Sequence, residues 1–152
     1  MNRLYDSSKA EYLRYLQTAA VNLRDLHNRG WVHGEIQMSN ILAETTQPLS
    51  TERKVWFVQL AHMVQLPRDE NQRRPYVQVK ESLNRRSYNR SAPEVIRNAV
   101  YSPESDVFSF AFVIWEIFYF LSGNQRHSLN QFDQLTQDDV SIYYSYGLKY
   151  PG

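Results

Sequence analysis

The side chains with the most obvious chemical capacity gather in one polar segment, His33 to Asn40. His33 could serve as a general base, because an imidazole titrates near neutral pH. Glu35 adds a carboxylate, and Asn40 adds an amide oxygen, which alone makes a poor site for a divalent cation. The chain has no cysteine, so a thiol nucleophile, a Cys-ligated zinc site and a disulfide scaffold are excluded.

Composition and charge exclude several classes of protein. Hydrophobic residues make up 42% and charged residues 22%, close to globular usage, so a disordered or fibrous chain is not expected. A formal charge of +1 provides no electrostatic footprint for nucleic acid or an anionic membrane. The most apolar stretch, Val107 to Leu121, is shorter than the roughly 20 residues that cross a bilayer. We expect no nucleic-acid partner and no membrane insertion. The lack of cysteine leaves the compartment open, and we favour the cytoplasmic side.

A long helix is predicted ahead of this polar segment. Ser8 and Glu11 have the spacing of a capping box at a helix start. Gly30 can take the left-handed conformation that ends such a helix. Between them, a single apolar stripe is expected to face the core: Leu13, Leu16, Ala20, Leu23 and Leu26.

Short strands and a long loop are predicted to follow. Trp31 to His33, Ile41 to Ala43 and Val55 to Val58 have the composition of short extended segments, and the last is expected to be buried. The polar stretch from Pro67 to Arg90 has no clear period and predicts a loop.

A second long helix is predicted to begin at Ser102-Pro103-Glu104, which combines a capping hydroxyl, a proline at the first helical position and an acid in the first turn. Apolar side chains between Val107 and Phe120 cover nearly every face, so we expect protein on all sides of this helix. Thr136 to Asp139 suggests a third helix start, running towards Gly147.

These segments, taken in order, resemble the protein kinase family. His33 to Asn40 has the spacing of the catalytic loop, His-Arg-Asp-Leu-x-x-x-Asn. Lys54 to Ala61 is similar to the strand that leads into the magnesium motif Asp-Phe-Gly, and Ala92-Pro93-Glu94 matches the Ala-Pro-Glu that closes the activation segment. Ser105 to Ala111, followed by Trp115-Glu116, resembles the start of the central helix, in a form most similar to tyrosine kinases. Single short motifs recur by chance, but several in the right order form a strong joint signal.

The resemblance implies a mainly α fold, a kinase-like C-terminal lobe with a few short β-strands, in which residues 1–152 form one partial domain. That domain would run from the catalytic-loop region through the third long helix. No Gly-x-Gly-x-x-Gly loop and no strand lysine of the Val-Ala-Ile-Lys kind precede the first helix. We therefore expect an incomplete kinase domain without the small lobe that covers ATP.

The resemblance also assigns the chemical positions, several of which are altered. Glu35 stands where the family has its catalytic aspartate, and its longer side chain moves the carboxylate by roughly 1 Å, enough to cost about 100-fold where positioning dominates. Asn40 matches a residue that binds one magnesium ion in the family. Phe57 stands in the place of the magnesium-binding aspartate and has no oxygen to offer a hard cation. Gly34 replaces the arginine that often pairs with a phosphorylated activation loop.

Three further positions have structural roles by resemblance. The counterpart of His33 mainly packs and forms hydrogen bonds, and we prefer that role to the general base. Asp106 would tether the backbone of the catalytic loop. Glu94 would pair with an arginine beyond the end of this chain, so we expect it to be exposed, paired differently, or completed by another chain.

Our first hypothesis is a pseudokinase: a signalling scaffold or allosteric module that binds a protein partner, possibly another kinase, and needs no cofactor. The alternative is part of an active, ATP-dependent protein kinase, tyrosine-specific by resemblance, that uses Glu35 and Asn40 with Mg-ATP. The third is a truncated chain that does not fold stably, which a broad melt would indicate.

A group of arginines could meet an acidic partner, but a solvated loop is the preferred interpretation: Arg73, Arg74, Arg85, Arg86 and Arg90. Tyr76 and Tyr88 lie where kinases are often phosphorylated.

Overall fold

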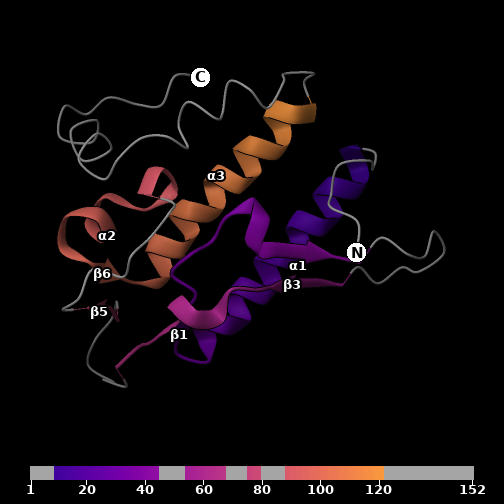
Figure 1. Cartoon of the computed structure of the whole chain (residues 1–152). Helices are drawn as coiled ribbons and strands as arrows, with labels where there is room; N and C mark the ends of the chain where they lie inside the picture. Colours follow the sequence, from indigo (N-terminus) through magenta and orange to yellow (C-terminus); the bar gives the residue numbers. More distant parts are fainter. Residues whose placement is uncertain (1–8, 45–53, 68–74, 80–87, 122–152) are drawn as a thin grey trace.

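The computed structural model describes residues 9–44, 54–67, 75–79 and 88–121, and these form a mainly helical structure with short antiparallel strands (Figure 1). The α-helices of this part are α1 Lys9–Asn28, α2 Pro93–Asn98 and α3 Pro103–Leu121. Short 3-10 helices join them: η1 Met38–Asn40, η2 Leu60–His62 and η3 Tyr88–Arg90. The predicted fold class is confirmed.

Each described strand pairs with one antiparallel neighbour. β1 Trp31–Val32 pairs with β4 Val64–Gln65, and β2 Ile41–Ala43 pairs with β3 Val55–Phe57. β5 Val77–Gln78 pairs with β6 Val100–Tyr101. The segments predicted at β1, β2 and β3 are confirmed as strands. The predicted loop from Pro67 to Arg90 is wrong at two places: β5 is ordered by backbone pairing with β6, and Tyr88–Arg90 form η3.

The first helix forms as predicted, but its buried face is rotated from the predicted stripe. Leu16 and Leu23 are buried, whereas Leu13 and Ala20 are exposed. The buried positions are Tyr12, Tyr15, Leu16, Ala19 and Leu23. The prediction counted aliphatic residues and left out tyrosine, whose ring packs inside while its hydroxyl finds a partner: Tyr15 Oη donates to the Glu44 carbonyl at 3.0 Å. The capping residue Ser8 lies outside the described residues.

The second long helix, α3, begins at the predicted proline. Ser102 and Ser105 cap it reciprocally: the Ser105 amide donates to Ser102 Oγ at 3.2 Å, and the Ser102 amide donates to Ser105 Oγ at 3.1 Å. The expectation of protein on all sides is wrong, because Val107 is 56% exposed and Phe118 is 46% exposed. They are eleven residues, about three helical turns, apart and so lie on the same side of α3.

Two apolar clusters form the described core. The larger lies between α1, β2, β3 and α3, where Tyr15 and Leu23 pack with Phe110, Val113 and Ile117. The smaller joins β1 and α2 through Val32, Ala92, Val95 and Tyr101. Figure 1 shows α1 and α3 passing on either side of the loop that follows β1. No helix in the described part is long and apolar enough to span a bilayer. The third helix, predicted from Thr136, lies outside the described residues.

Candidate functional site

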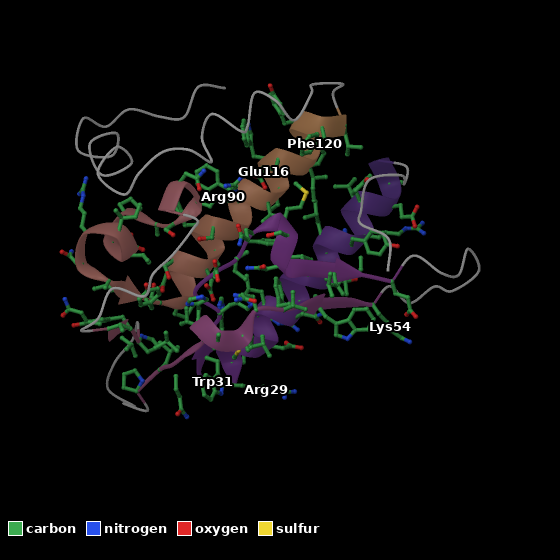
Figure 2. The ribbon with its side chains drawn as sticks, viewed as in Figure 1. Arg29, Trp31, Lys54, Arg90, Glu116 and Phe120 are labelled. Atoms are coloured by element: carbon green, nitrogen blue, oxygen red, sulfur yellow. The ribbon has the colours of Figure 1, made fainter. Side chains whose placement is uncertain are left out.

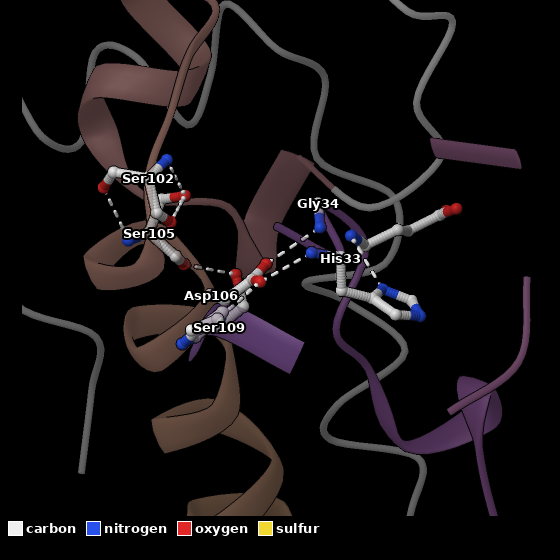
Figure 3. A network of polar contacts seen from close by, with 8 residues as sticks. His33, Gly34, Ser102, Ser105, Asp106 and Ser109 are labelled. Carbon is white, nitrogen blue, oxygen red and sulfur yellow. Dashed lines mark hydrogen bonds and ion pairs between the residues drawn. The ribbon is translucent and has the colours of Figure 1, made fainter. Parts of the chain in front are cut away.

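The Asp106 carboxylate is the centre of the polar network between α3 and the loop after β1. It lies in the first turn of α3 and is 1% exposed. Its Oδ2 accepts the His33 amide at 2.7 Å, and its Oδ1 accepts the Gly34 amide at 2.8 Å (Figure 3). A buried carboxylate is costly unless donors satisfy it. Asp106 therefore fixes the backbone of this loop, the role that the resemblance assigned to it.

A histidine of α1 completes the set of donors. His27 Nε2 lies 2.9 Å from Asp106 Oδ2, and its side chain is 12% exposed. The network thus joins α1, the loop and α3. The sequence did not identify His27, because its place on a helical face says nothing about a partner in α3.

The His33 ring is buried and bonded at both nitrogens. Its Nε2 lies 3.0 Å from the Val58 carbonyl, and its Nδ1 accepts the Glu35 amide at 3.3 Å. A carbonyl can only accept and an amide can only donate, so these partners select the neutral imidazole with its proton on Nε2. Burial lowers the pKa of His33, and the nearby Asp106 carboxylate opposes this shift. The geometry fits the preferred structural role, because neither nitrogen is free to take a substrate proton.

The Glu35 carboxylate faces His62, a residue that the sequence did not single out. Glu35 Oε2 lies 3.2 Å from His62 Nε2, and the two side chains are 9% and 19% exposed respectively. Neither Glu35 Oε2 nor His62 Nδ1 has a hydrogen-bond partner. The contact is therefore at ion-pair distance but lacks the alignment of a hydrogen bond. A single sequence carries no signal of this pairing, because η2 is brought to the loop only by the pairing of β1 with β4.

Asn40 holds the loop together from inside. Its Nδ2 donates to the Glu35 carbonyl at 2.9 Å, and its own carbonyl accepts the Val58 amide at 2.9 Å. The side chain is buried. These bonds connect the loop with the residue that follows β3.

Phe57 ends β3 and lies opposite Ile41 in the register. Its ring packs against the larger apolar cluster, and its centroid lies 5.6 Å from that of His33. The expectation of a buried strand holds for Val55, but Trp56 is 42% exposed, since alternate side chains of a strand point to opposite faces. Two residues on, Gln59 has φ 67° and ψ 50°, a left-handed conformation that favours glycine.

Arg90 is not in a solvated loop, contrary to the prediction. It donates from Nε to Glu116 Oε1 at 2.7 Å, and its side chain is 15% exposed (Figure 2). The other arginines of the predicted group lie outside the described residues, as does the side chain of Tyr88, whereas Tyr76 is exposed. Glu94 lies half-buried in the first turn of α2, and no ion pair joins its carboxylate to another described residue.

The family model for protein tyrosine and serine/threonine kinases matches residues 4–144. The chain belongs to the protein kinase family. The match includes the loop after β1, β3, α2 and α3, the segments whose motifs predicted the family. No curated protein matches this kinase domain.

Kinase chemistry requires a carboxylate near the incoming hydroxyl and metal ions that neutralise charge on the phosphates. Magnesium prefers carboxylate oxygens, and neither of the two positions that the resemblance assigns to the metal, Asn40 and Phe57, carries a carboxylate. Phe57 offers no oxygen, whereas the bond from Asn40 Nδ2 to the loop backbone does not use Asn40 Oδ1, which is a single amide oxygen. The residues that the structure describes include no group of three or more acidic, histidine or cysteine side chains able to hold a metal ion.

Proposed function

We propose that this kinase domain is catalytically degenerate and acts by binding a protein partner, as a signalling scaffold or an allosteric module. The observation that carries the proposal is the Phe57 ring, which packs against the apolar core and His33 at the position where the family has a magnesium-binding carboxylate. An aromatic ring at that position cannot bind a hard cation. The closest resemblance of α3 is to tyrosine kinases, so we propose a tyrosine-kinase-like origin.

The retained framework supports a role for the folded domain itself. Asp106 still fixes the loop backbone, and Arg90 still joins the segment before α2 to α3. Buried polar groups whose hydrogen bonds are only partly satisfied lower the stability of the fold. The framework that presents a surface is thus intact while the chemical positions are altered.

An active kinase is the second candidate, and one observation favours it. Glu35 and Asn40 lie in the same loop, and the Asn40 amide nitrogen donates to the Glu35 backbone carbonyl, a bond that does not use Asn40 Oδ1. Under this alternative, Mg-ATP would be the cofactor and protein hydroxyls the substrates.

Thermal unfolding of the full chain with and without millimolar Mg-ATP tests the choice. A ligand that binds only the folded state must raise the melting temperature by mass action, by about 2.7 kcal/mol of stability at 100 times its Kd. We expect a cooperative melt that Mg-ATP does not move. Magnesium chloride alone and ATP with EDTA are the controls, and they separate metal-dependent binding from binding of nucleotide alone. A rise in melting temperature that requires both magnesium and ATP would overturn the proposal that the domain is catalytically degenerate. A broad melt would indicate a chain that does not fold stably.

A further inference from the structure

The Glu35 carboxylate, which stands at the family's catalytic position, is buried. Its side chain is 9% exposed, and the next residue, Ile36, is 2% exposed and anchors the loop in the larger apolar cluster. An ionised carboxylate in such surroundings needs a compensating charge or donors. Glu35 Oε2 has no hydrogen-bond donor.

Among the described groups near Glu35, His62 is the one that contacts its carboxylate. His33 is held neutral by its two backbone partners, so its ring contributes no positive charge. The Asp106 carboxylate is occupied by two backbone amides and His27. Within the described part of the chain, His62 is the side chain found at ion-pair distance from Glu35.

The position of His62 is fixed on both sides along the chain. Before it, β3 pairs with β2, and Gln59 turns the backbone into η2. After it, the Met63 amide donates to the Leu60 carbonyl at 3.1 Å, and β4 pairs with β1, directly ahead of His33. The β1–β4 and β2–β3 pairs therefore fix the positions of the segments that carry Glu35 and His62.

We propose that His62 caps the Glu35 carboxylate and closes it to an incoming hydroxyl, so that the position of the family's catalytic carboxylate is blocked as well as altered. For Glu35 to accept a proton, the imidazole would first have to move away. The effect of the cap on catalysis rests on the proposed function. The contact between His62 and Glu35 can be tested without nucleotide.

Carbodiimide coupling of carboxylates to an amine, read residue by residue by mass spectrometry on the full chain, measures access to Glu35. Glu104, exposed in the first turn of α3, is the internal reference. We expect Glu35 to react at least tenfold more slowly than Glu104. In the variant His62→Ala the Glu35 rate should rise at least fivefold, while Leu60→Ala, a change at an exposed position of the same 3-10 helix, should leave it unchanged.

Two results would overturn the proposed cap. One is that Glu35 reacts as fast as Glu104 in the unmodified chain; the other is that the Glu35 rate does not change in a folded His62→Ala variant. If His62→Ala loses its cooperative melt, His62→Asn replaces it and is held to the same criterion. The melting experiment with Mg-ATP separates the two proposals. If Glu35 is protected and Mg-ATP raises the melting temperature, the His62 cap is supported and the proposal of a catalytically degenerate domain is overturned. If Glu35 reacts freely and Mg-ATP does not change the melting temperature, the cap is overturned and the degenerate domain is supported.

Discussion

Arg90 reaches from η3 to Glu116 in the middle of α3, and Figure 2 shows the two side chains meeting beside that helix. Arg90 Nη1 also donates to Asn89 Oδ1 at 3.0 Å. Glu116 is 4% exposed, so the pair is a buried one. It joins the segment that leads into α2 to the helix that passes through the core.

Arg90→Met should destabilise the domain by about 3–5 kcal/mol, because it removes the guanidinium that pairs with the buried Glu116 carboxylate. The measurement is urea unfolding followed by circular dichroism. Arg24→Met is the matched control, since Arg24 pairs with Asp25 in solvent and its loss should change stability by less than about 0.5 kcal/mol. The double variant Arg90→Met/Glu116→Leu should recover most of the loss, and a double variant as unstable as the single one would contradict this account.

Asp106→Asn should cost about 3 kcal/mol, because an amide provides one acceptor oxygen where the carboxylate provides two, and its NH₂ group would face the donors of the loop. Glu104→Gln, an equivalent change at an exposed position of the same helical turn, should be nearly neutral. Equal effects of the two variants on the urea midpoint would show that the Asp106 bonds contribute little.

His33 predicts a pH dependence of stability. Burial lowers its pKa in the folded state below the ordinary value of 6.5, so the unfolded chain binds a proton first as pH falls. The contribution of His33 is therefore fully present above pH 6.5 and is lost as pH falls below that value, by up to about 1.4 kcal/mol per pH unit.

The measurement for His33 is the urea midpoint between pH 8 and pH 5 for the unmodified chain and for His33→Gln. The groups that face the ring, Asp106, Glu35 and His62, are present in both proteins, so the difference between the two curves isolates His33. The stability difference between them should narrow as pH falls below 6.5. A constant difference would mean that the ring titrates alike in the folded and unfolded chains.

Gln59→Gly should raise the free energy of unfolding by about 0.5–1 kcal/mol. The residue has φ 67°, where a Cβ is strained, and glycine relieves that strain at some cost in unfolded-state entropy. Gln65→Gly in β4 is the control, because there the backbone is extended and glycine should destabilise. The two variants should move the thermal midpoint in opposite directions, and a shared sign would be inconsistent with strain at Gln59.

The sequence predicted the elements well and the contacts between distant elements poorly. The start of α3 and the positions of β1, β2 and β3 followed from local signals such as Ser102-Pro103 and short apolar runs. These signals act within a few residues, and so they are visible in one chain. The buried face of α1 was misplaced because tyrosine was not counted as a core residue.

The contacts of the site depend on pairs that no local pattern encodes. Arg90 looked like one of several loop arginines, and only its contact with Glu116 shows that it is buried. His27 and His62 were overlooked because each partner lies in another element, Asp106 in α3 and Glu35 in the loop after β1. The resemblance to kinases supplied the positions of Glu35, Asn40 and Phe57, but it could not supply what surrounds them.

The bonds from Asp106 to His33 and Gly34 have a consequence for how the chain is made. A ribosome delivers the loop after β1 long before it delivers α3, and chains fold from their N-terminal end as they emerge. Until α3 is synthesised, the bonds from the His33 and Gly34 amides to Asp106 cannot form. The hairpin of β2 and β3 and the bonds of Asn40 can form early, but the link between this loop and α3 forms only when the carboxylate of Asp106 arrives.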